Sequence, residues 1–394
     1  MKLGVSNKGY IVLVSLFAFS LPLKENWSSI ALIFLIIYSL IIFFNKKEYM
    51  RIKDFFSHNN FMTKLFFLGF MFLILGLFSF FINGGVVHDF DFKRLSFPLL
   101  FFVFVLFFSL KIFKIVEVKY FMISFFVGLS LSGFIRVFTG IQDFFINDKS
   151  FLFSRIGIPF EDMLSSNPII YGVFINICWA YFLIDFLKTR TRRLQFSLLF
   201  LTLTLFLSTN FSLTGAVLII FNSFFIITFY YNKRIYKLQV ITVLVLSVIG
   251  FVFLLQPSGK LLLSRVEGES SRVRNYETSQ KLFKNLPFFG YGVGNELSTL
   301  QDNRNIKSWE YINKYHAHNQ YFEFLIGGGW PYLINYVLII GLTVIYALKI
   351  ENILLVSFMV TIIITMYFES LLVIHKGLLL VAFLLSYLIL VNDR

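Results

Sequence analysis

The chain of 394 residues is 58% hydrophobic and only 14% charged, whereas a soluble domain carries roughly 25% charged residues. Aromatic residues make up 20% of the chain, with 55 phenylalanines, so most of it must contact lipid or other apolar helices. These values exclude a soluble globular protein and leave the net charge of +14 to the short stretches between apolar runs. The single cysteine, Cys178, excludes an intrachain disulfide.

Apolar runs recur along the whole chain, and a transmembrane helix needs about 20 such residues. The runs are too long and too uniformly apolar for the strands of a barrel, which alternate with period 2. The sequence therefore predicts an all-α polytopic membrane protein of about twelve transmembrane helices. The predicted spans cover residues 10–23, 29–44, 65–82, 97–110, 120–139, 168–187, 194–208, 215–231, 238–255, 321–348, 353–374 and 377–391.

The positions of Lys and Arg predict the orientation of these spans. More than half of the Lys and Arg residues fall in the segments that lie on the same side as the N-terminus. The positive-inside rule therefore places both termini in the cytoplasm. Three regions follow: about nine N-terminal helices in 1–255, a large periplasmic loop in 256–318, and about three helices in 319–394. A cleavable signal peptide over residues 1–20 is the alternative for the first run, but Pro22 and the adjacent second span favour a signal anchor.

The loop 256–318 is the one long polar segment in a chain of otherwise short connections, and such loops usually carry function. Apolar positions between 278 and 288 predict a short amphipathic helix at the membrane interface, ended by Pro287. Gly290, Gly292 and Gly294 follow. They indicate either a flexible turn or a backbone that a bulky polar ligand can approach closely.

Several arginines are candidates for binding phosphate. Arg272 and Arg274 lie just before the predicted helix, and an arginine fork grips phosphate oxygens with two hydrogen bonds. Arg136 interrupts the apolar run 121–139, where a charge is costly and by default functional. Arg155 lies in the next loop on the same side of the membrane. Contacts with anionic headgroups, and snorkelling of Arg136 to the interface, are the alternatives.

Two histidines stand where the long loop meets the next span. His318 has the chemistry of a general base, since an unperturbed imidazole titrates near pH 6.5; a helix cap is the alternative. His316 is two residues away, so the pair would bind a metal only from an extended backbone, and zinc is disfavoured. Asn319 would orient the imidazole or serve as the cap. Asp89 and Asp91 are a weak candidate for a divalent metal.

Taken together, these motifs resemble the O-antigen ligase and polymerase superfamily. In that family an Arg opens the large periplasmic loop, a P-x-x-G-x-G turn follows, and a His-Asn-x-Tyr segment leads into a glycine-marked helix. The matching positions are Arg272, Tyr276, Pro287, Gly290, Gly292, His318, Asn319 and Tyr321. The family's further Arg is missing from 209–215, so Arg136 is expected to substitute for it.

The resemblance implies a metal-independent, inverting glycosyltransferase of the bacterial inner membrane that uses no cofactor. The donor would be an undecaprenyl-pyrophosphate-linked glycan and the acceptor lipid A-core or another lipid or glycan; membrane lipids are the other partners, and nucleic acid is not expected. His318 would be the catalytic base and Arg272 would neutralise the leaving pyrophosphate. The residues implied in substrate binding are Arg136, Arg155, Arg274, Tyr276, Gly290, Gly292, His316, Asn319 and Tyr321.

Two alternatives to a ligase remain open from the sequence. A repeat-unit polymerase of the same superfamily differs in its acceptor, which the motifs do not identify. A polar-lipid transporter or flippase would need several ionisable groups near the bilayer midplane and two symmetric halves. Only Arg136 and Glu369 approach that requirement, so the transporter is disfavoured.

Overall fold

A computed structural model describes residues 5–23, 25–45, 61–83, 92–109, 117–147, 168–189, 213–254 and 271–391, and within these ranges every regular element is a helix. The predicted all-α class is confirmed for this part of the chain. The helices are α1 (Val5–Ser20), α2 (Glu25–Asn45), α4 (Phe61–Ile82), α5 (Phe92–Ser109), α6 (Val118–Asn147), α8 (Pro168–Thr189), α10 (Leu213–Tyr231), α11 (Lys233–Leu254), α13 (Ser271–Lys284), α14 (Glu296–Asp302), α15 (Trp309–Ile312), α16 (Gln320–Lys349), α17 (Ile353–Phe368) and α18 (His375–Val391).

Among the described residues, five helices are long and apolar enough to cross a membrane. They lie in α2, α4, α6, α8 and α16. Shorter apolar helices, of 10 to 17 residues, lie in α1, α5, α10, α17 and α18. The chain is therefore a helical membrane protein; the count of twelve spans stays a prediction, and the predicted span 194–208 lies outside the described residues.

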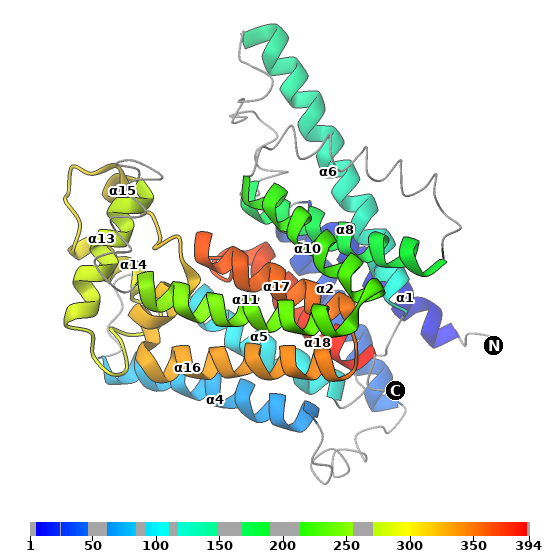
Figure 1. Ribbon diagram of the computed structural model, residues 1–394, viewed down its shortest axis with the longest axis horizontal. Coiled ribbons are helices and arrows are strands. Elements are labelled where there is room, and N and C mark those ends of the chain that lie inside the picture. Colours follow the sequence, from blue (N-terminus) through cyan, green and yellow to red (C-terminus); the bar gives the residue numbers. More distant parts are fainter. Residues whose placement is uncertain are drawn as a thin grey trace.

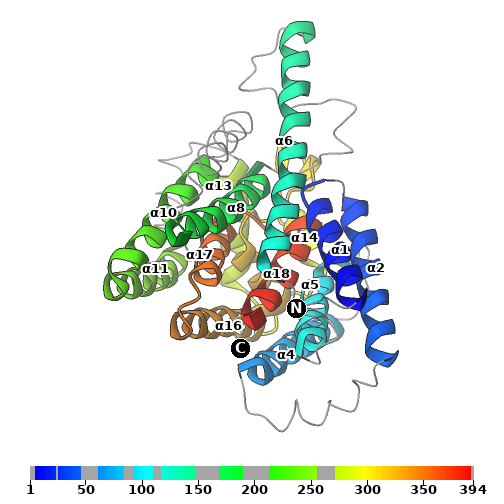
Figure 2. The ribbon, with the colours of Figure 1, turned by 90° about the vertical axis from the view of Figure 1, so that its right-hand side faces the viewer.

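The loop helices α13, α14 and α15 gather at one end of the bundle (Figure 1). The beginning of α1 and the end of α18 lie at the opposite end, and Figure 2 shows both toward the viewer. This arrangement agrees with two termini on one side of the membrane and the large loop on the other. Which side is the cytoplasm stays a prediction from the Lys and Arg distribution.

Aromatic side chains form much of the contact between helices. Phe72 of α4 stacks on Tyr332 of α16 with ring centroids 4.1 Å apart, and Phe17 of α1 meets Phe383 of α18 edge to face at 4.9 Å. All four rings are buried. Part of the phenylalanine bias thus supplies interior packing, for which offset and edge-to-face rings are favourable.

A buried polar cluster ties α8, α10 and α17 together. Asn222 Nδ2 donates to Asn176 Oδ1 at 3.0 Å and to Thr361 Oγ1 at 2.8 Å, and Thr361 Oγ1 donates to the carbonyl of Ser357 at 2.8 Å. Hydrogen bonds between helices of this kind stabilise membrane bundles by about 0.6 kcal/mol on average. They fix which faces of the three helices meet.

Two helices depart from the apolar runs in the sequence. The predicted span 353–374 is broken, because α17 ends at Phe368 and a turn follows before α18 begins at His375. Glu369 is the extended residue at this break. Within α16, Gly329 has φ 69 and ψ −164, so the helix is kinked there. Both interruptions face the polar loop and shape the candidate site.

Candidate functional site at the loop and α16

Helix α13 begins at Ser271, seven residues before the predicted start. Arg272 and Arg274 therefore lie in its first turn and not ahead of it, which corrects the sequence interpretation. On its apolar side, Tyr276 packs on Phe322 of α16 with ring centroids 5.6 Å apart, and Leu282 is buried in the same cluster. Part of the apolar side of this helix is thus covered by α16, while Phe288 beyond its end is 63% exposed, and its location at the membrane interface stays a prediction.

Tyr276, expected to contact substrate, is buried by this packing. Its hydroxyl accepts a hydrogen bond from Gln280 Nε2 at 3.1 Å. Burial raises the pKa of Tyr276 to about 12, with Gln280 opposing the shift, so the phenol remains protonated at neutral pH. In this structure the side chain holds α13 against α16.

Arg274 makes an ion pair across the loop. Its Nε and Nη2 donate to Glu310 Oε1 at 2.9 and 2.7 Å, and the Glu310 side chain is buried while Arg274 is partly exposed. Burial is the largest single influence and opposes ionisation of Glu310. The hydrogen bonds and charge of Arg274, together with hydrogen bonds from the Glu310 backbone and the Ser308 hydroxyl, outweigh it and hold the pKa of that carboxyl below its ordinary value. Arg274 therefore joins α15 to α13, and its role in phosphate binding stays a prediction.

We expect Arg274→Gln to lower the melting temperature near neutral pH. We also expect the melting temperature of the variant to fall less than that of the wild type on acidification. A carboxyl whose pKa is depressed by folding contributes stability above its unfolded value, about 4.3, and loses it as the pH falls through the folded value. The wild type should lose stability below about pH 4.3, and the variant should lose less of it there. Melting temperatures between pH 3.5 and 7 test this. Lys307→Gln, which removes an exposed charge from the same loop, should melt like the wild type, and identical acid profiles for all three proteins would contradict the assignment.

Arg304, which no sequence motif singled out, closes the loop from within. Its Nη2 donates to Asn275 Oδ1 at 2.6 Å and its Nη1 to the carbonyl of Tyr315 at 2.5 Å. Burial lowers the pKa of Arg304, and the carboxylates of Glu323 and Glu310 oppose that shift. The guanidinium thus joins α13 to the segment that carries the histidines.

The glycine turn packs against the kink in α16. Tyr291 N donates to the carbonyl of Ile326 at 2.8 Å, and Gly292 N to the carbonyl of Gly327 at 2.9 Å. From the other side, Ser79 Oγ of α4 donates to the same Gly327 carbonyl at 2.9 Å. The close approach that Gly290 permits is therefore to the backbone of α16, whereas a Cβ at Gly292 would meet the Asn295 side chain. Ligand binding by this turn stays a prediction.

Gly290→Ala should destabilise the protein strongly. At φ 69 a non-glycine residue costs about 1–2 kcal/mol, and a Cβ at Gly290 would lie 2.4 Å from the carbonyl oxygen of Gly327. Thermal unfolding in detergent measures the effect. Gly341→Ala is the matched control in α16, where no atom lies within 4 Å of the new carbon. Equal melting temperatures for the two variants would show that the turn is not packed as described.

His318 lies in a turn immediately before α16, with φ 52. Few non-glycine residues adopt this left-handed backbone, and where they do the strain often marks a functional site. The next residue, Asn319, is the N-cap of α16: its Oδ1 accepts from the backbone N–H groups of Tyr321 and Phe322 at 3.0 and 3.1 Å. Of the two roles predicted for Asn319, the cap is the one observed. The Tyr321 hydroxyl donates to the carbonyl of Ile363 in α17 at 3.1 Å.

The imidazole of His318 is paired with Glu369. Its Nδ1 lies 3.1 Å from Glu369 Oε1; the histidine side chain is 24% exposed and the carboxylate 5% exposed. An ionised carboxylate only accepts hydrogen bonds, so this contact assigns the proton of the neutral ring to Nδ1 and the lone pair to Nε2. The geometry is that of a base oriented by a carboxylate.

Glu369 is itself held by the turn between α17 and α18. Its Oε1 accepts from Ser370 N at 3.1 Å, and Ser370 Oγ donates to Glu323 Oε1 at 3.2 Å. Glu323 Oε1 also accepts from Ala317 N at 2.8 Å. Two buried carboxylates thus hold the turn that carries His318. Glu369 bonds to the imidazole ring, and Glu323 bonds to the backbone N–H of Ala317 just before it.

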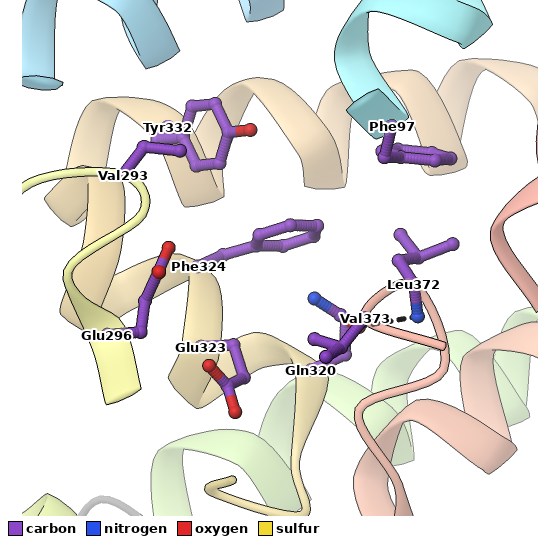
Figure 3. A pocket seen from close by; sticks show the side chains of 9 residues that line it. All are labelled: Phe97, Val293, Glu296, Gln320, Glu323, Phe324, Tyr332, Leu372 and Val373. Atoms are coloured by element: carbon purple, nitrogen blue, oxygen red, sulfur yellow. Dashed lines mark hydrogen bonds between the residues drawn. The ribbon is translucent and has the colours of Figure 1, made fainter. Parts of the chain in front are cut away.

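A small pocket lies behind this turn (Figure 3). Its polar lining residues are Glu296, Gln320 and Glu323, and each accepts a backbone N–H bond. Gln320 Oε1 takes its bond from Leu372 N at 2.7 Å, which ties the beginning of α16 to the turn after α17. Phe97 and Leu372 lie across from Glu296 in Figure 3. The bonds of Gln320 and Glu323 thus hold the segments on either side of His318, while Glu296 bonds within the glycine turn.

Two further predicted site residues, Arg272 and His316, are partly buried. Arg272 lies in the first turn of α13, and His316 lies ahead of α16. Arg136 lies in α6, with its side chain outside the described residues, and Arg155 lies outside them altogether, as do Asp89 and Asp91. The structure thus joins His318 and Asn319 to α17, and the roles of Arg136 and Arg155 stay predictions.

Residues 196–337 match the family model described as O-antigen ligase. The matched region contains α10, α11, the loop helices and the motif from Arg272 to Tyr321, which confirms the resemblance to the O-antigen ligase and polymerase superfamily. No curated protein matches the chain. Glu369 lies beyond the matched region.

Proposed function

Because the chain carries an O-antigen ligase domain, we propose that it transfers a glycan from undecaprenyl pyrophosphate to an acceptor hydroxyl at the periplasmic face of the inner membrane. The pairing of His318 with Glu369 carries this proposal, because it supplies an oriented base next to the long loop. We propose that the protein is a ligase and that its acceptor is lipid A-core. The enzyme is proposed to invert the anomeric centre and to need no metal.

His318 Nε2 takes the proton of the acceptor hydroxyl as its oxygen attacks the anomeric carbon. The bond between that carbon and the pyrophosphate oxygen breaks on the opposite face, and undecaprenyl pyrophosphate leaves with the bonding electron pair. Glu369 stabilises the imidazolium that forms, since a carboxylate on Nδ1 favours the protonated ring. The proton is later lost to water.

Arg272 is proposed to hold the leaving pyrophosphate. It lies in the first turn of α13, where backbone N–H groups without helical partners and the positive end of the helix dipole also favour an anion. Arg155 and Arg136 are proposed to add to this positive field. Fixed positive charges at the leaving group stabilise the transition state where a divalent ion acts in other transferases.

The reaction is tested with purified protein, lipid-linked glycan donor and acceptor in the presence of EDTA. Transfer that is undiminished by the chelator, with a product of inverted anomeric configuration, is expected. Transfer that requires an added divalent metal, or that retains configuration, would overturn the mechanism.

Deletion of the gene distinguishes a ligase from a polymerase. A ligase mutant accumulates long lipid-linked chains and leaves the core bare, whereas a polymerase mutant places a single repeat on the core. We expect the first result. The second would assign the same chemistry to a polymerase, and unchanged long chains on the core would contradict both.

A further inference from the structure

The segment from Ile306 to Lys314 exposes large apolar side chains outside the membrane spans. Ile306, Trp309 and Ile312 are 71%, 59% and 65% exposed. Trp309 and Ile312 are three residues apart in α15, so they share a face of this short helix. A tight group of exposed Ile and Trp is unusual on a surface in contact with water and indicates an interaction site.

The opposite side of the segment is firmly attached to the loop. Glu310 is buried and bonded to Arg274, and its carbonyl accepts from Tyr315 N at 3.0 Å. Ser308 caps α15, because its side chain accepts from Tyr311 N at 3.2 Å. The apolar face is therefore presented by a fixed structure.

The charge of the exposed face identifies its partner. Lys307 and Lys314 flank the apolar residues and are exposed, while Glu310, the segment's acid, is turned inward. A tryptophan beside aliphatic residues, with lysines around them, is the composition of elements that lie in the headgroup region of a bilayer. Anionic phospholipid headgroups complement the lysines.

The place of the segment in the chain agrees with contact to lipid. Ile312 stands eight residues before Gln320, where the candidate membrane span 320–349 begins. Figure 1 shows α15 grouped with α13 and α14 at the loop end of the bundle. The segment is thus close to the beginning of α16 in the chain and lies at the same end of the bundle.

We infer that Ile306, Trp309 and Ile312 insert into the headgroup region of the bilayer on the loop side, with Lys307 and Lys314 on anionic phospholipid. The interfacial element of this inference is α15, whereas the sequence pattern favoured α13. The contact holds the long loop against the membrane surface independently of the transfer reaction.

Spin labelling tests this in the full-length protein. Cys178 is buried and is the chain's one cysteine, so Cys178→Ser combined with Ile312→Cys gives a single labelling site. Asp302→Cys in the same background is the matched control, because Asp302 is an exposed polar residue of α14. Both proteins are placed in nanodiscs of phosphatidylethanolamine and phosphatidylglycerol.

The measured quantity is the ratio of nitroxide accessibility to oxygen and to a water-soluble nickel chelate. A severalfold higher ratio at position 312 than at 302 is expected, with the difference reduced when Lys307 and Lys314 are both changed to Gln. Equal ratios would place the face in water and overturn the inference. Exclusion of both reagents from position 312 would show that protein covers the face, which also overturns it.

Discussion

His318→Ala is expected to reduce glycan transfer by about 10²–10⁴-fold, the contribution of a positioned general base. The structure places Nδ1 of this imidazole on Glu369, and Nε2 is the atom that we propose accepts the proton. Removal leaves the acceptor hydroxyl to be deprotonated by water, while the arginines and the loop still bind the donor. Initial rates with purified protein, lipid-linked donor and acceptor measure the loss.

The controls separate chemistry from folding. His318→Asn removes the base but keeps a residue that tolerates the left-handed backbone at φ 52, so it should lose activity with little change in melting temperature. His375→Ala, which removes a histidine bonded to Ser29 at 2.7 Å, should retain most transfer. Undiminished transfer by folded His318→Asn would remove His318 as the base.

Glu369→Gln is expected to lower the turnover number by roughly 10–100-fold. Hydrogen bonds to charged groups contribute about 1.5–3 kcal/mol, and each 1.36 kcal/mol in a barrier is about tenfold in rate. The amide retains the shape of the side chain but cannot stabilise the imidazolium by its charge. Since Glu369 reaches the substrate only through His318, KM should change little.

The division between kcat and KM tests this positioning role. A structural fault in the turn after α17 would alter KM and the melting temperature together, whereas loss of the carboxylate that orients His318 should change kcat alone. Glu369→Asp keeps the charge and should recover part of the rate. A Gln variant with wild-type kcat would show that the contact is structural.

The sequence predicted the helical class and the segment that carries the motifs, because apolar runs and local residue types determine both. The same reasoning placed the functional loop before α16 and chose His318 within it. Asn319 was expected to cap the helix or to orient the ring. The choice between these roles depended on the position of α17 relative to His318. Local sequence patterns do not predict that position.

Long-range contacts account for what the sequence did not predict. Glu369 lies 51 residues from His318, and its one signal was a carboxylate inside an otherwise apolar run. The ion pair of Arg274 with Glu310, 36 residues away, was not predicted, because only the fold brings the two side chains together. Gly290 indicated a close approach correctly, and the group that approaches it in the structure is the backbone of α16.

The helix predicted at 278–288 is another case in which the local sequence did not determine the long-range contacts. In the amphipathic pattern at 278–288, Leu282 and Phe283 pack in the cluster with Phe322 of α16, while Phe288 is exposed, as are Trp309 and Ile312 of α15. An apolar face in a sequence indicates burial without identifying what covers it. Only the arrangement of α13 against α16 distinguishes protein from lipid as the covering medium.

A structure of the full chain with bound undecaprenyl-pyrophosphate-linked glycan tests the central claim most directly. We expect the pyrophosphate beside Arg272 and His318 Nδ1 still on Glu369. The anomeric carbon should face His318 Nε2 with the face opposite the leaving oxygen. A donor whose pyrophosphate lies on the other side of the membrane, or whose anomeric carbon is out of reach of an acceptor bound at His318, would contradict it.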